Sequence, residues 1–265
     1  MLFMYTNNRH LVIALIITTL GILLTVSLIF KTTPNKKETI FVGVVSQDKP
    51  YSWYDHQKKL TGFNVDLVKK IARKNNMHAK FITGSHTYLY HKFKHGKIQL
   101  LLLNRSPAEL AKKTYSKTDT YLYQPNVLLT LPNHRLNVLE KAANRKIAIS
   151  DKLDIPSTLQ DFKISFSRYS QTDTILQAVL AKHVSGAVIS DYAYSAAVQN
   201  DPLLTTELVK NSPFPPLVSQ QMYGVIPAGN KELLQKVNQS LTKFKQDGSL
   251  AELSQKYFSQ DWSKQ

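Results

Sequence analysis

The sequence contains no cysteine among its 265 residues. Disulfide bonds, zinc sites built from thiolates and a lipid anchor attached to cysteine are therefore excluded. The sequence also lacks a nucleophile elbow, a P-loop, a His-Glu-x-x-His motif and the glycine fingerprint of dinucleotide binding. His91 and His95 are four residues apart, but no third metal ligand lies near them in the sequence. These absences favour a protein that is not an enzyme and holds no metal or cofactor.

Acidic residues are scarce, since 18 Asp and Glu stand against 34 Lys and Arg, and the formal net charge is +16. The lysines are scattered, often in pairs, with no run of five or more. No zinc-finger, basic-zipper or RNA-binding signature accompanies them. We therefore expect no nucleic-acid partner and attribute the positive charge to a location near an anionic envelope surface.

One long apolar run is present, because residues 11–30, LVIALIITTLGILLTVSLIF, contain no charge. A helix of this length spans about 30 Å, the thickness of a bilayer hydrocarbon core. A cleaved signal peptide has a shorter apolar stretch of ~7–15 residues and a small-residue exit, which is missing at Leu28-Ile29-Phe30. The sequence thus predicts an uncleaved signal anchor, a single transmembrane helix, with cleavage as the alternative. Flanking charges leave its orientation open, and we expect the large domain outside the cytoplasm.

Strand-like and helix-like segments alternate after the apolar run. Apolar segments predict buried strands at 39–45, 79–83, 98–103, 146–149 and 186–189. Amphipathic segments predict helices at 63–74, 88–95, 172–182 and 192–199. This alternation is typical of βαβ units and predicts an α/β fold with parallel sheets. A strand at 222–226 and helices at 231–246 and 249–257 remain, which indicates that the chain returns to its first half.

Short motifs also occur in a fixed order between residues 39 and 262. They include Pro50-Tyr51-Ser52-Trp53, Leu60-Thr61-Gly62-Phe63, Gly186-Ala187-Val188-Ile189-Ser190-Asp191 and Asp247-Gly248-Ser249-Leu250. Each motif alone is weak evidence. Together they resemble bacterial extracellular solute-binding proteins of family 3, which are the substrate-binding partners of ABC transporters for polar amino acids.

This resemblance implies a two-lobed, periplasmic-binding-protein-like fold of type II, the Venus-flytrap, in which two crossover strands join the lobes. A small polar solute, an amino acid or an amine, would bind in the cleft through hinge closure. The chain would begin with an anchor and stalk at 1–37. Lobe 1 would comprise 38–127 plus 222–265, and lobe 2 would comprise 128–221. The crossover strands would lie near 127–131 and 218–223. The implied partners are the solute, an ABC permease and the cell membrane, through the N-terminal helix. The protein would be a monomer on the periplasmic or extracellular face.

In the resembled family an Asp of lobe 2 holds the ammonium of an amino acid and an Arg holds its carboxylate. Asp191 matches that Asp, although an Asp here also suits a helix start. The family's Arg falls on Glu109, which would repel a carboxylate. Either Arg105 supplies the guanidinium, or the solute lacks an α-carboxylate. A third interpretation, a degenerate site with Glu109 on the surface, also stays open.

Two further departures concern the charge of the cleft. The family's Gly-Thr or Gly-Ser turn, which receives a carboxylate at a helix N-terminus, falls at Ser150-Asp151-Lys152-Leu153. Asp151 disfavours an anion there, while Lys152 could offset it. Asp48 lies where many relatives have a stacking aromatic residue. These changes favour a solute with positive charge over a standard amino acid.

The remaining candidate solute contacts come from loops and strand ends. Tyr51 and Trp53 could offer aromatic faces to an ammonium, although Trp53 fits a core position better. The resemblance places other contacts in the roofing loop, at a strand-to-helix edge and near the hinge: His86, Tyr88, Asn104, Ser106, Tyr169 and Thr172.

Two other functions share this fold. Relatives that resemble cyclohexadienyl or arogenate dehydratases use the same cleft for the loss of water and carboxylate, and a buried Glu109 could act there as a general acid. A membrane-anchored sensing module is the second alternative, since closure could signal to a partner.

Overall fold

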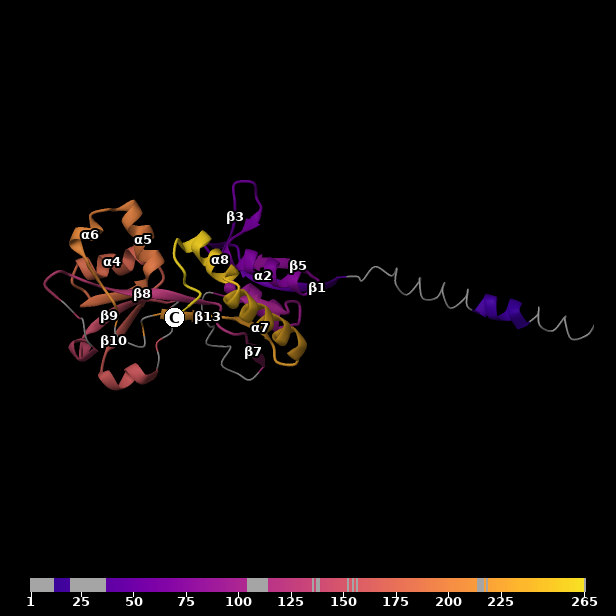
Figure 1. Ribbon diagram of the computed structural model, residues 1–265. Coiled ribbons are helices and arrows are strands. Elements are labelled where there is room, and N and C mark those ends of the chain that lie inside the picture. Colours follow the sequence, from indigo (N-terminus) through magenta and orange to yellow (C-terminus); the bar gives the residue numbers. More distant parts are fainter. Residues whose placement is uncertain are drawn as a thin grey trace, which may run out of the picture. The chain divides into compact units, whose positions relative to one another are not determined.

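The computed structural model describes residues 12–19, 37–103, 114–134, 136, 139–151, 153, 155, 157–213, 217 and 219–264. Met1–Glu38 and Thr39–Gln265 are two compact units. Residues 12–19 of the first unit are helical (Figure 1). Within the described ranges, no helix is both long and apolar enough to cross a membrane. Most of the predicted span lies outside those ranges, so the anchor stays a prediction.

The first sheet of the larger unit joins strands from both ends of the chain. Its order is β5 (Met77–Gly84), β1 (Glu38–Val45), β6 (Leu100–Leu102), β14 (Gly224–Pro227) and β7 (Tyr115–Lys117). β1 and β6 are parallel, as predicted, whereas β14 is antiparallel to both β6 and β7. The C-terminal strand therefore does return to the first half.

Helices cover both faces of this sheet because its central strand is apolar throughout. Leu100 and Leu102 of β6 belong to one buried cluster, with residues of α2 (Phe63–Lys74), α7 (Lys231–Gln246) and α8 (Ser249–Phe258). Leu101 belongs to another cluster, with α3 (His86–Lys94). Successive strand residues point to opposite faces, so a continuous apolar run is buried on both sides. α2, α7 and α8 contact one another (Figure 1).

The second sheet contains only residues from the middle of the chain. Its order is β10 (Ser165–Tyr169), β9 (Lys146–Ser150), β11 (Gly186–Ser190), β8 (Leu122–Thr130) and β12 (Val209–Asn211). β9, β10 and β11 are parallel, and β8 is antiparallel to β11 and β12. The flanking helical elements are α4 (Thr172–Leu180), α5 (Asp191–Asn200), α6 (Leu204–Glu207) and the 3-10 helices η2 (Leu139–Ala142) and η3 (Ser157–Phe162).

β8 connects the two sheets through its two halves. Residues 122–125 pair with β13 (Ser219–Met222), and residues 126–130 pair with β11 and β12. The strand pair that passes between the sheets is thus formed by 122–125 and 219–222. The first crossover lies earlier than predicted, because residues 127–130 are already buried within the second sheet.

A third, small sheet forms where the sequence suggested only a loop. β2 (Gln47–Asp48), β3 (Ser52–Tyr54) and β4 (Leu60–Thr61) form antiparallel pairs. The N–H of Tyr51 donates to the carbonyl of Asp48 at 2.7 Å and closes the turn between β2 and β3. This hairpin fixes the backbone of Asp48.

Asp66 of α2 joins this helix to α8 through two hydrogen bonds and also faces a lysine of its own helix. Its Oδ2 accepts hydrogen bonds from Lys256 Nζ at 2.8 Å and from the Tyr257 hydroxyl at 2.7 Å, and Lys69 Nζ lies 3.8 Å from Oδ1. Partial burial would raise the pKa of Asp66, but the hydrogen bonds and the lysine charges outweigh it and hold the pKa below its ordinary value. The ionised form is therefore the one that stabilises the fold.

We expect Asp66→Asn to lower the free energy of unfolding by about 1 kcal/mol at pH 7. Because the pKa of Asp66 is lower in the folded chain than in the unfolded one, the stabilisation is complete above about pH 5. It disappears as the pH falls from about 4 through the lowered pKa. Urea denaturation of the variant and the unmodified chain at pH 7 and at pH 3 measures the difference in the free energy of unfolding at each pH. An equal difference at the two pH values would contradict this role.

Candidate functional site

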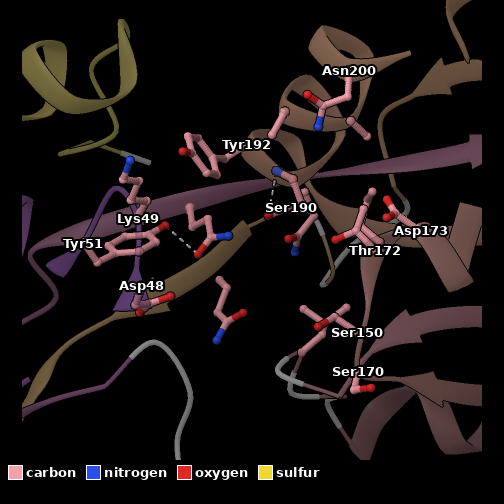
Figure 2. A pocket seen from close by; sticks show the side chains of 18 residues that line it. Asp48, Lys49, Tyr51, Ser150, Ser170, Thr172, Asp173, Ser190, Tyr192 and Asn200 are labelled. Atoms are coloured by element: carbon pink, nitrogen blue, oxygen red, sulfur yellow. Dashed lines mark hydrogen bonds between the residues drawn. The ribbon is translucent and has the colours of Figure 1, made fainter. Parts of the chain in front are cut away.

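A cavity of about 330 Å³ lies where the crossing strands meet the second sheet (Figure 2). Cavities of roughly 300–1,000 Å³ are typical of small-molecule sites. The small hairpin, the crossing strands β8 and β13, and the strand ends and helices of the second sheet contribute to its walls. The lining residues are Asp48, Lys49, Tyr51, Gln124, Asn126, Ser150, Leu153, Ser170, Thr172, Asp173, Ile189, Ser190, Tyr192, Ala193, Ala196, Ala197, Asn200 and Gln220.

Amide side chains of the crossing strands form one wall. Gln124 of β8 and Gln220 of β13 face each other in the register of the pair. The Tyr51 hydroxyl donates to Gln124 Oε1 at 2.9 Å, the contact drawn in Figure 2. Asn126 Nδ2 donates to the carbonyl of Leu217 at 2.9 Å. The hairpin is thus tied directly to the strands that connect the two sheets.

Hydroxyl groups at strand ends form another part of the lining. Ser150 ends β9, Ser190 ends β11 and Ser170 directly follows β10. These strands are parallel, so their carboxyl ends meet at one edge, where α/β folds place ligands. Ser190 Oγ accepts a hydrogen bond from the N–H of Ala193 at 3.2 Å and caps α5.

Three charged side chains are among the described lining residues: Asp48, Lys49 and Asp173. Asp48 is half-buried, whereas Asp173 is exposed. Burial and then the charge of Asp48 raise the pKa of Tyr51 well above its ordinary value. The pKa of Tyr192 is raised by the same two causes in the same order. The field of Asp48 therefore reaches tyrosines on two walls of the cavity, and both hydroxyls stay neutral.

Three of the residues proposed from the sequence line this cavity. Asp48 comes from β2, Tyr51 from the turn that follows and Thr172 from the first turn of α4. Residues of the first loop and of the second half are thus brought together, although contact with a solute stays a prediction.

Four other candidates lie outside this lining. Trp53 is half-buried and packs edge-on against Tyr257, with ring centroids 6.1 Å apart, but it is not among the buried core residues, so the core position considered for it is not confirmed. His86 and Tyr88 begin α3 rather than a loop, and Tyr169 ends β10 beside Ser150.

Asp191 begins α5 and pairs with a lysine. Its Oδ1 lies 2.7 Å from Lys210 Nζ in β12. It is absent from the lining described above and borders a second hollow, between α5 and the end of α8. Its role in binding stays a prediction.

Five residues discussed in the sequence analysis lie outside the described residues: Asn104, Arg105, Ser106, Glu109 and Lys152. The alternatives that rest on them, including the missing carboxylate clamp, therefore stay open. In the part of the chain that is described, no group of three or more His, Cys, Asp or Glu is arranged to hold a metal ion.

Several lining residues were not proposed from the sequence. Ser190 and Tyr192 flank the predicted Asp191, so the sequence pattern that pointed to the end of this strand missed both of them by one residue. Gln124 and Asn126 gave a weaker signal, since they are polar residues in the largely apolar strand β8, and Gln220 gave none, since β13 is mostly polar. Only the pairing of β8 with β13 brings them to one place.

Comparison with known proteins agrees with the fold described above. The model of the family "Bacterial extracellular solute-binding proteins, family 3" matches residues 40–260. The probable amino-acid-binding protein YxeM of Bacillus subtilis is 25% identical over 230 residues, 84% of each chain. A probable amino-acid ABC transporter-binding protein of Haemophilus influenzae is 24% identical, over 85% of this chain and 87% of that protein. The unliganded, open L-cystine solute receptor of Neisseria gonorrhoeae has the same fold, with a TM-score of 0.65 and 19% identity over 87% of this chain and 97% of that one.

Proposed function

Because the chain belongs to family 3 of the bacterial extracellular solute-binding proteins, we propose that its cavity binds a small polar solute, an amino acid or an amine, for an ABC importer. The position of the cavity carries this proposal. Its walls come from the hairpin of the first half, from the crossing strands and from strand ends of the second sheet. A solute held there would contact all three.

We propose lobe 1 as 38–127 plus 222–265 and lobe 2 as 128–221. The membership of the sheets supports this division except at residues 126 and 127, which already pair with β11, since β14 lies in the first sheet and β9 to β12 lie in the second. Among the strands that the structure describes, β8 and β13 are the two that pass between these sheets. Bending at this strand pair would bring Tyr51 toward Thr172 and exclude water from the solute, as in hinge closure of other two-lobed binders.

The cavity of this proposal performs no chemistry, and the protein acts as a monomer outside the cytoplasm. The apolar run at 11–30 would tether it to the membrane beside its permease. The relatives described above are named as binding proteins, which supports binding over catalysis. Turnover of a prephenate-like substrate would instead support the dehydratase alternative.

A thermal-shift screen of the full chain against amino acids, polyamines and small organic cations tests the proposal. A solute at ~100 times its dissociation constant should raise the free energy of unfolding by about 2.7 kcal/mol. Stabilisation by at least one solute, with no product formed, is the expected result. If no member of the screen stabilises the protein, solute binding by this cavity is rejected.

A further inference from the structure

We propose that the C-terminal segment, residues 259–264, is a latch that α5 meets when the two sheets close around a solute. The inference rests on the proposed function, because it concerns how the solute-bound state is held. Three observations support it: the attachment of this segment to the crossing strands, the hollow between the segment and α5, and the polar groups on both sides of that hollow.

The C-terminal segment is attached to the crossing strands and to the core of the first sheet. The N–H of Tyr123 in β8 donates to the carbonyl of Trp262 at 2.7 Å, so the segment lies beside the strand pair that connects the sheets. The buried ring of Trp262 stacks on Phe258 of α8, with centroids 4.3 Å apart, within the apolar cluster of the first sheet. Ser254 Oγ accepts the N–H of Trp262 and donates to the carbonyl of Gln260, both at 2.8 Å. The segment should therefore move together with the first sheet.

A hollow of about 400 Å³ lies between this segment and α5. Its α5 wall includes Ser195 and Gln199, and its other wall includes Ser259, Gln260 and Trp262. α5 directly follows β11 and packs in the apolar cluster of the second sheet. The two walls thus belong to different sheets, so bending at β8 and β13 changes the width of the hollow.

Closure around a solute would narrow this hollow together with the main cavity. Tyr192 of α5 lines both spaces and packs against the apolar cluster of the first sheet. On the facing side, the ring of Tyr51, which lines the main cavity, lies 5.4 Å from the ring of Phe258, which lines the hollow. The two spaces are therefore neighbours, and movement of α5 toward the first sheet reduces both.

The facing surfaces carry complementary hydrogen-bonding groups. Ser195 and Gln199 are exposed and four residues apart, so they share one face of α5, and neither side chain bonds to a residue that the structure describes. Across the hollow, Ser259 and Gln260 are also exposed. Gln260 Oε1 accepts the indole N–H of Trp262 at 3.3 Å, and its amide N–H groups remain as donors. Hydrogen bonds that form only on closure would stabilise the closed state selectively.

Two introduced cysteines test this contact, because the chain contains no other thiol. The full chain carrying Ser195→Cys and Gln260→Cys is oxidised with diamide, and the intramolecular disulfide is quantified by mass spectrometry. A disulfide requires Cα atoms within about 7 Å, so it reports the approach of α5 to the segment. We expect it to form at least about tenfold faster than in the control with Asp161→Cys and Gln260→Cys, since Asp161 is exposed on η3 outside the hollow. Equal rates would overturn the inference.

Gln199→Ala tests whether the contact holds the solute. L-Arginine, L-glutamine, L-histidine and putrescine are titrated calorimetrically against the full chain. For each probe that binds, the variant should raise the Kd at least about threefold, because a less populated closed state lowers the apparent affinity. Gln199 lies outside the lining of the main cavity, so loss of a direct solute contact there does not explain this effect.

Gln239→Ala is the matched control, since Gln239 is an exposed glutamine of α7 outside the hollow. It should leave the Kd unchanged. Unchanged affinity in Gln199→Ala, or equal losses in both variants, would overturn the latch.

The outcomes distinguish the latch from the proposed function. If no amino acid or amine of the broader screen binds, the proposed function is rejected, whereas cross-linking needs no solute and still tests the contact. Solute binding combined with equal cross-linking rates would keep the proposed function and overturn the latch.

Discussion

Gly62→Ala is expected to lower the free energy of unfolding by about 3 kcal/mol or more. Gly62 has φ 126° and ψ 170°, a conformation available in practice only to glycine. An added Cβ would also collide with the carbonyl oxygen of Tyr51 and lie 2.9 Å from the Cα of Ser52. These are backbone atoms, so no side-chain rotation can relieve the overlap.

The position of Gly62 extends the damage beyond one residue. The first N–H groups of α2 have no partner within the helix. Here the N–H of Phe63 donates to the carbonyl of Pro50 at 3.0 Å and that of Asn64 to the carbonyl of Tyr51 at 2.9 Å. A shift at Gly62 would break both bonds and move the hairpin that carries Asp48. Solute affinity should therefore fall together with stability.

Gly96→Ala is the matched control for this prediction. Gly96 also has a positive φ, 68°, but nothing lies within 4 Å of an added Cβ. Gly96→Ala should therefore lower the free energy of unfolding by only about 1 kcal/mol, the cost of holding an alanine in the left-handed backbone region. Guanidinium denaturation of both variants measures the difference. Equal losses would show that the collision with Tyr51 contributes nothing.

Local sequence patterns predicted the elements that pack through one continuous apolar face. The predicted bounds of α2 and α7, 63–74 and 231–246, are confirmed, because each helix has a regular apolar stripe and a clear start at Gly62 or Asn230. Asn230 caps α7 by accepting the N–H of Leu233 at 3.1 Å. The same reasoning located β6 as a central strand, since its residues are apolar on both faces.

Elements defined by distant partners could not be predicted in the same way. The predicted strand at 222–226 is two strands, β13 and β14, which pair with different sheets on either side of Tyr223. Their residues form one run in the sequence, and only the tertiary partners divide it. The amide wall of the cavity could not be predicted for the same reason, because Gln124 and Gln220 are far apart in the chain. Local motifs led to Asp48, Tyr51 and Thr172 but left the amide wall unpredicted.

Ala193→Phe is expected to abolish solute binding while the protein stays folded. Ala193 lies in the first turn of α5, is half-buried and lines the cavity next to Ser190 on the helix surface. Long side chains on a helix lean toward its N-terminus. The new phenyl ring would therefore extend toward the strand-end wall formed by Ser190 and Ser150, into the space that a solute needs.

The measurement is the thermal shift produced by a solute that stabilises the unmodified chain. The variant should lose that shift, a difference of about 2.7 kcal/mol at ~100 times the dissociation constant. Its own stability should change by no more than about 1–2 kcal/mol, because Ala193 has free volume beside it. Ala251→Phe, a half-buried position near the start of α8 and outside the cavity, controls for the added bulk and should keep the full shift. If the Ala193 variant folds and still binds with unchanged affinity, the solute site lies elsewhere, and the hollow beside Asp191 becomes the next candidate.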